Sequence, residues 1–175
     1  MERIEAINIW RGTYRGVPFE VNNFSLGGDP KWTFYLHIYL DQMPEDIRER
    51  FWLEPDPPME EFKNRVFYPY NYEPLINDLA WHHGCTFYEK IMGFDGARRV
   101  VKIGCDYNHL WDQERTYTLE AVSSDARRCI DSLYELIPNI KKWCRWCGEF
   151  FVPEKDAQDR CPQCVEKAQE KEASL

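Results

Sequence analysis

The sequence contains no long hydrophobic run. No stretch approaches the roughly 20 apolar residues that a transmembrane helix needs. The first ten residues carry three charges and lack the apolar core of a secretory signal peptide. We therefore expect a protein without a membrane span that acts in the cytoplasm.

The sequence also lacks an excess of positive charge. It has 22 Lys and Arg against 30 Asp and Glu, a formal net charge of −8. Residues 1–140 hold 15 basic and 23 acidic side chains, whereas residues 141–175 hold 7 of each. Non-specific nucleic-acid binding depends on clustered cations. We therefore expect no general coating of DNA or RNA by this chain.

Histidine is scarce, with four residues, but cysteine is not, with seven. In a chain without a secretory signal, cysteines at regular spacing indicate metal ligands before disulfides. Two C-x2-C pairs separated by thirteen residues provide four thiolates: Cys144, Cys147, Cys161 and Cys164. This spacing predicts a structural zinc site with no open coordination position. We assign residues 141–175 to a small zinc ribbon with a charged tail.

The pattern of residues 1–140 predicts one α+β domain. Apolar residues alternate with polar ones in three segments, 4–13, 17–24 and 32–40, which indicates an antiparallel meander with one buried face. Residues 85–91 and 99–105 predict a hairpin, and residues 118–137 carry the apolar stripe of a long helix. The expected fold is an antiparallel sheet packed against this helix. His37 falls on the outer face of the sheet, where we expect an ordinary surface histidine.

The predicted hairpin brings two polar segments together. With Asp95-Gly96 as a two-residue turn, facing positions sum to about 191. His82 and His83, which enter the first strand, then meet Asp106 and His109, which leave the second. The candidate ligand-binding residues at this open end of the hairpin are His82, His83, Asp106, His109 and Asp112.

Three interpretations of this polar group remain open. The residues can form a buried hydrogen-bond network that binds nothing. They can form a polar pocket for a small ligand, with aromatic side chains as walls. They can also form a catalytic or metal site, because histidine and aspartate hold divalent ions and exchange protons near neutral pH.

The central part of the chain resembles an uncharacterised family of small, mostly phage-encoded proteins. The resemblance covers about residues 10–140 and rests on a signature of the form H-G-x-T-[FY] followed by G-C-D-x-x-H-x-x-D. The residues that carry it are Tyr14-Arg15-Gly16, Glu20-Val21-Asn22, Trp32, His82–Tyr88 and Gly104–Asp112. The resemblance implies a phage or prophage origin and action inside a bacterial host.

Two functional hypotheses follow. The first is a non-catalytic accessory or host-interaction protein, with an anti-defence role as one example, that binds a small polar or nucleotide-like ligand or a host protein. The alternative is a small hydrolase or nuclease-like enzyme that uses Asp106 and His109.

Overall fold

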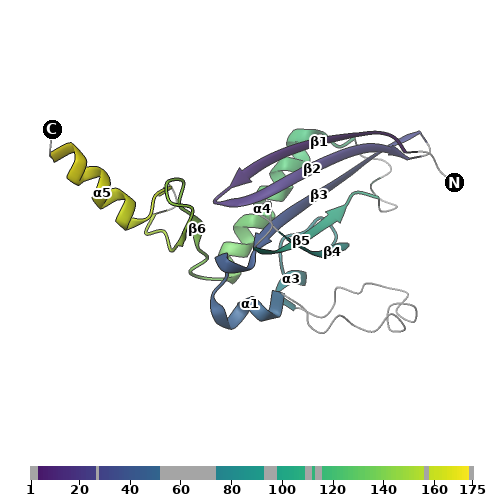
Figure 1. Cartoon of the computed structure of the whole chain (residues 1–175). Coiled ribbons are helices and arrows are strands. Elements are labelled where there is room, and N and C mark those ends of the chain that lie inside the picture. The colour runs from purple at the N-terminus through teal and green to yellow at the C-terminus, as the bar shows by residue number, and fades with distance from the viewer. Residues whose placement is uncertain are drawn as a thin grey trace.

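The computed structural model describes residues 4–26, 28–51, 74–92, 98–108, 112, 116–155 and 158–173. Its centre is a five-stranded antiparallel sheet with strand order β1-β2-β3-β5-β4. The long helix α4 (Leu119–Leu136) packs on one face of this sheet, over β2 and β3 (Figure 1). The α+β class predicted from the sequence is confirmed. The strands are β1 (Ile4–Tyr14), β2 (Val17–Leu26), β3 (Asp29–Tyr39), β4 (Phe87–Met92) and β5 (Arg99–Asp106).

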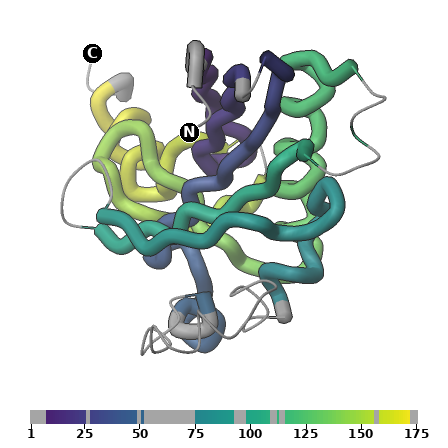
Figure 2. The backbone as a smooth tube through the Cα atoms, turned by 90° about the vertical axis from the view of Figure 1, so that its right-hand side faces the viewer, coloured from purple at the N-terminus to yellow at the C-terminus, as the bar shows by residue number. Residues whose placement is uncertain are grey.

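Shorter elements extend this centre. Between β3 and β4 the chain forms the 3-10 helix η1 (Leu40–Gln42), then α1 (Glu45–Phe51) and α3 (Pro74–Asn77). The C-terminal part contains a two-stranded sheet and one helix: β6 (Lys142–Trp143), β7 (Phe150–Phe151) and α5 (Pro162–Ala173). This part lies beside one end of the large sheet (Figures 1 and 2). Among the described helices, none has the length and apolar character that a membrane crossing requires.

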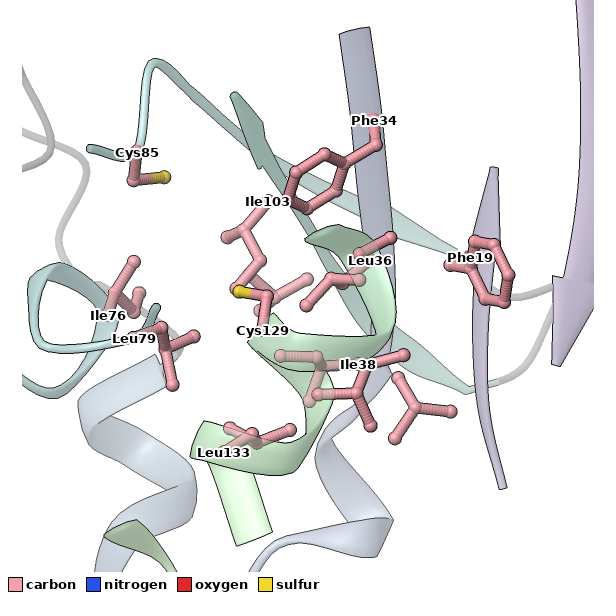
Figure 3. Close-up of a cluster of buried hydrophobic side chains, with 14 of the residues drawn as sticks. Phe19, Phe34, Leu36, Ile38, Ile76, Leu79, Cys85, Ile103, Cys129 and Leu133 are labelled. Carbon is pink, nitrogen blue, oxygen red and sulfur yellow. The ribbon is translucent and has the colours of Figure 1, made fainter. Parts of the chain in front are cut away.

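Strand β3 supplies the centre of the hydrophobic core. Its residues alternate between the two faces of the sheet, as the pleat of a strand dictates. Phe34, Leu36 and Ile38 are fully buried on the face that α4 covers. Figure 3 shows these three side chains opposite Cys129 and Leu133 of α4. The buried face of the meander is therefore the one predicted from the alternation.

Helix α4 begins and ends where the sequence predicts. Thr118 adopts an extended conformation and its hydroxyl accepts a hydrogen bond from the Ala121 N–H at 3.2 Å, which caps the helix. The chain leaves the helix at Ile137, directly before Pro138. The buried residues recur at helical spacing: Val122, Ala126, Cys129, Ile130 and Leu133.

The expectation that His37 is a surface histidine is wrong. The side chain is 10% exposed and its Nε2 lies 3.7 Å from Glu20 Oε2 on the neighbouring strand. Lys102, from the strand on the other side, places Nζ 2.7 Å from Glu20 Oε1. Burial is the main cause that lowers the pKa of His37, outweighing the attraction of Glu20. Burial alone would raise the pKa of Glu20. The charges of Lys102 and His37 have the opposite and larger effect, so that the pKa of Glu20 lies below its usual value. The outer face thus holds an ionic network.

The C-terminal part contacts the large sheet through a few specific groups. Gln42 Nε2 donates to the carbonyl oxygens of Gly16 at 3.0 Å and of Lys141 at 3.2 Å. The guanidinium of Arg98 lies 4.0 Å from the centre of the Trp143 ring, and its Nη2 donates to the Gly148 carbonyl. These contacts fix the C-terminal part relative to the end of the sheet.

Gly104, in the middle of β5, offers a test of the packing between strands. A Cβ at this position would overlap the carbonyl oxygen of Phe34 and the ring of Tyr35. We expect Gly104→Ala to destabilise the fold by about 1–3 kcal/mol, because a backbone atom of the central strand would have to move. Urea unfolding measures the change. Gly12→Ala is the control, since its added Cβ would meet only the end of the Phe19 ring, at 2.9 Å. Equal losses for the two variants would contradict the packing described for β5.

Candidate functional site

Two groups of metal-ligating side chains occur in the described part of the chain. The first joins the four cysteines of the C-terminal part: Cys144, Cys147, Cys161 and Cys164. The second joins His82, His83 and Asp112. In each group the candidate ligand atoms lie within 4.8 Å of one another.

The spacing of the four cysteine sulfurs fits a tetrahedral metal ion. Cys147 Sγ and Cys161 Sγ are 3.7 Å apart. Four sulfurs at about 2.3 Å from a tetrahedral ion would lie about 3.8 Å from each other. All seven cysteines of the chain are free thiols, so none of the four sulfurs is engaged in a disulfide. The cysteine group is therefore positioned to hold a metal ion.

The backbone around the first cysteine pair turns toward the sulfurs. Gly148 adopts a φ of 76°, a conformation that favours glycine, and its N–H donates to the Cys144 carbonyl at 3.0 Å. The β6–β7 pairing continues through the Cys144 N–H, which donates to Glu149 O at 2.8 Å. The Cys161 N–H reaches Cys144 Sγ at 3.3 Å, which links the two cysteine pairs.

The thiols of this group have unequal proton affinities. Desolvation raises the pKa of Cys144, but hydrogen bonds from the backbone N–H groups of Cys147, Cys161 and Trp146 outweigh it and lower the pKa to about 6. The neighbouring thiol of Cys161 is the main cause that raises the pKa of Cys164 to about 12. Crowded sulfurs cannot all ionise without a cation. A bound metal ion would provide the positive charge that stabilises four thiolates.

The second group is built around the carboxylate of Asp112. Its Oδ1 accepts a hydrogen bond from the Tyr117 hydroxyl at 2.5 Å and faces His82 Nε2 at 2.9 Å. An ionised carboxylate only accepts hydrogen bonds, so His82 donates from Nε2 in this pair. The Asp112 side chain is 2% exposed and that of His82 is 11% exposed. The three side chains form a compact, nearly buried polar network.

Aromatic rings hold the imidazole of His82 in place. Its ring stacks on Tyr107 with a centroid distance of 4.1 Å and an interplanar angle of 15°. The Tyr107 hydroxyl donates to Asp125 Oδ2 at 2.8 Å, which anchors this ring to helix α4. Burial is the main cause that raises the pKa of Tyr107, so the phenol keeps its proton as the donor. The Tyr117 ring packs at a steep angle against both rings, with its centre 5.4 Å from that of His82 and 4.7 Å from that of Tyr107.

His83 occupies a strained position beside this network. Its φ is 63°, in the left-handed region that residues other than glycine seldom adopt, and Gly84 follows with a φ of 117°. His83 Nε2 lies 4.0 Å from Asp112 Oδ1, and the side chain is 37% exposed. Such strain persists only where the surrounding structure imposes it, and it concentrates at functional sites.

The hairpin register agrees with the sequence prediction, and three of the five predicted polar residues lie together. Phe87 pairs with Gly104, and the numbers of each facing pair sum to the expected value. Asp106 Oδ1 accepts the N–H of Asn108 at 3.1 Å, a local turn hydrogen bond. The structure therefore brings together His82, His83 and Asp112. The predicted turn residues 95–96 and His109 lie outside the described residues.

A cavity of about 630 Å³ opens beside the Asp112 network. One wall is formed by Lys31 and Trp32 at the start of β3 and by Asn23 on the adjacent strand β2. The opposite wall comes from the segment after β5 and the approach to α4. It contains Tyr107, Asn108, Asp112, Thr116 and Tyr117. Sequence reasoning missed Tyr117 and Lys31, since neither belongs to a motif, although Tyr117 directly precedes the helix predicted over residues 118–137.

The fold and the two groups define the class of the protein. It is an α+β protein with an antiparallel sheet, one long covering helix and a C-terminal module whose four cysteines are positioned to hold a metal ion. No protein-family model, curated protein or solved structure matches the chain. The resemblance to phage-encoded proteins therefore stays a prediction.

Proposed function

We propose that the protein is a non-catalytic accessory protein that binds a small, polar, nucleoside-like ligand in the cavity beside Asp112. The observation that carries this proposal is the cavity itself. Its volume of about 630 Å³ falls within the range of small-molecule sites, roughly 300–1,000 Å³. It lies against the network in which Asp112 joins His82 and Tyr117.

The chemistry of the lining supports a ligand with a planar ring and hydrogen-bonding edges. Trp32, Tyr107 and Tyr117 offer ring surfaces, and base-like rings stack on such side chains. The amides of Asn23 and Asn108 can donate and accept at the same time. This combination suits the edge of a nucleobase.

The charges of the lining favour an uncharged ligand over a phosphorylated one. Lys31 is the cationic side chain among the described lining residues, whereas Asp29 and Asp112 are both acidic. A phosphate in this cavity would face two carboxylates and one ammonium group. We therefore expect nucleosides to bind better than their monophosphates when no cation is added.

The C-terminal module contributes structure in this proposal. We assign zinc to the four cysteines, because four thiolates at tetrahedral spacing suit zinc and leave no position for a substrate. A docking surface for a host protein is the further role that we assign to this module. The resemblance noted above suggests the cytoplasm of a bacterial host as the setting.

The alternative is a small hydrolase or nuclease-like enzyme that uses Asp106 and His109. In the structure Asp106 accepts a local backbone hydrogen bond from Asn108. His109 lies outside the described residues.

Calorimetric titration of the zinc-loaded full chain with the four ribonucleosides and their 5′-monophosphates tests the proposal. We expect at least one nucleoside to bind more tightly than its monophosphate. Asn108→Ala should weaken that binding about tenfold, because one hydrogen bond to the ligand is lost. Asn108 is exposed, so its loss should leave the melting temperature unchanged.

Two further variants sharpen this test. Lys155→Gln, on an exposed loop of the C-terminal module, removes a cation far from the cavity lining and should not change the affinity. Asp112→Asn should lower both affinity and stability, since Asp112 is buried within the network. The proposal fails if none of the nucleosides binds, or if Asn108→Ala binds them as tightly as the unchanged protein.

A further inference from the structure

We propose that His82, His83 and Asp112 form a second metal site, which binds one first-row divalent cation beside the cavity. Two imidazoles and one carboxylate are a donor set that such ions accept, often with open positions left for a ligand. The three donor atoms already lie within 4.8 Å of one another. This site is separate from the four cysteines and differs from them in donor chemistry.

The distances are close to those that an ion would require. Ligand atoms at about 2.1 Å from an ion lie about 3.0 Å apart at right angles and about 3.4 Å apart in a tetrahedron. His82 Nε2 and Asp112 Oδ1 are 2.9 Å apart, which already fits a shared ion. His83 Nε2 is 4.0 Å from the same oxygen, so its ring has to move closer by about 1 Å. With 37% of the His83 side chain exposed, that movement needs no repacking of the core.

The surroundings of the donors resemble those of a preorganised site. Side chains that contact the metal ligands and fix their orientation are a general feature of metal sites. The Tyr107 ring fixes the plane of His82 by stacking at 4.1 Å, and the Tyr117 hydroxyl holds Asp112 at 2.5 Å. His83 has a φ of 63°, and its ring lies beside that of His82, with the two ring centres 4.3 Å apart.

An ion at this position would change what the cavity can bind. Three protein ligands leave coordination positions open, and Asp112 and Tyr117 also line the cavity. For His82 to ligate through Nε2, the proton of the neutral ring moves to Nδ1, and the ion then adds two positive charges. This inference rests on the proposed function in one respect, namely that the cavity binds a ligand. The metal-loaded cavity should then accept a phosphate or carboxylate group that the metal-free cavity disfavours.

Addition of Co²⁺ to the zinc-loaded full chain tests the metal site without any organic ligand. Cobalt bound by nitrogen and oxygen donors gives weak visible absorption. Cobalt bound by thiolates gives an additional, strong sulfur-to-metal charge-transfer band. We expect one equivalent of Co²⁺ to bind with the first signature and without the second. His83→Asn should weaken this binding at least tenfold, and asparagine tolerates the positive φ of this position. Asp112→Asn should weaken it as well.

His37→Gln is the matched control. His37 also lies beside a carboxylate, that of Glu20 at 3.7 Å, but its surroundings include Lys102 and Arg11, which repel a cation. This variant should bind Co²⁺ as the unchanged protein does. The inference is overturned if the zinc-loaded protein takes up no Co²⁺, if all bound Co²⁺ shows the thiolate band, or if His83→Asn binds it with unchanged affinity. Nucleoside binding that persists in a metal-free cavity would leave the proposed function standing in each of these cases.

Discussion

Cys144→Ser is expected to release the metal ion from the C-terminal module and to unfold residues 141–173. A four-thiolate metal site contributes on the order of 10 kcal/mol to the folding of so small a module. The module has little else to stabilise it, since its buried cluster consists of Cys144, Cys161, Cys164 and Phe151. Metal bound by thiolates should fall from one equivalent to none, as the sulfur-to-metal charge-transfer band of the Co²⁺-substituted protein reports. Hydrogen exchange should become fast at the amides of Cys144 and Gly148, which are bonded in the folded module.

Cys129→Ala is the matched control for this prediction. Cys129 is as deeply buried as Cys144, but it belongs to helix α4 and the main core. Its substitution should lower the stability of the sheet and helix without releasing metal. Thiolate-bound metal that persists in full in Cys144→Ser, or is lost in Cys129→Ala, would show that the four-cysteine assignment is wrong.

Ile38→Ala is expected to destabilise the main domain by about 2–5 kcal/mol. Ile38 is fully buried on β3 beneath α4, so the truncation leaves a cavity between helix and sheet. Ile9→Ala is the control, because Ile9 belongs to the same sheet but is 47% exposed. The control should change the free energy of unfolding by less than about 0.5 kcal/mol. Thermal and urea unfolding measure both values.

Comparable losses from the two isoleucine variants would contradict the assignment of the covered face. If Ile9→Ala were the more damaging variant, the exposed side of β1 would have to be buried against another surface. If neither mattered, β3 would not form the centre of the core.

The elements were predictable because their signals are local. The alternation from Trp32 to Leu40 identifies β3 and its buried face without knowledge of any partner. Thr118 and Pro138 mark the two ends of α4. The spacing of the cysteine pairs predicts a metal site for a similar reason, since short C-x2-C segments bring their sulfurs together in any fold.

The environment of His37 was not predictable in the same way. Its burial depends on Glu20 from β2 and Lys102 from β5, which the sheet places on either side of it. No local pattern relates these three positions. A histidine on the polar side of a strand looks the same in the sequence whether or not such neighbours exist.

The composition of the histidine group illustrates the same limit. The hairpin register indicated that Asp106 would face the segment of His82 and His83, and the register itself is confirmed. The carboxylate that joins the histidines is nevertheless that of Asp112, which follows β5 by several residues. The path of a loop after a strand is set by contacts such as that of Tyr117 with Asp112, and it has no periodic signal in the sequence.

Native mass spectrometry of the zinc-loaded full chain with the four ribonucleosides tests the central claim most directly, because it reports both sites on one molecule. With one equivalent of zinc supplied, we expect a chain that carries one zinc ion and one nucleoside, and an Asn108→Ala chain that keeps the zinc ion but loses most of the nucleoside. A chain that holds zinc but no nucleoside at any concentration, or equal nucleoside occupancy of both chains, would contradict the account.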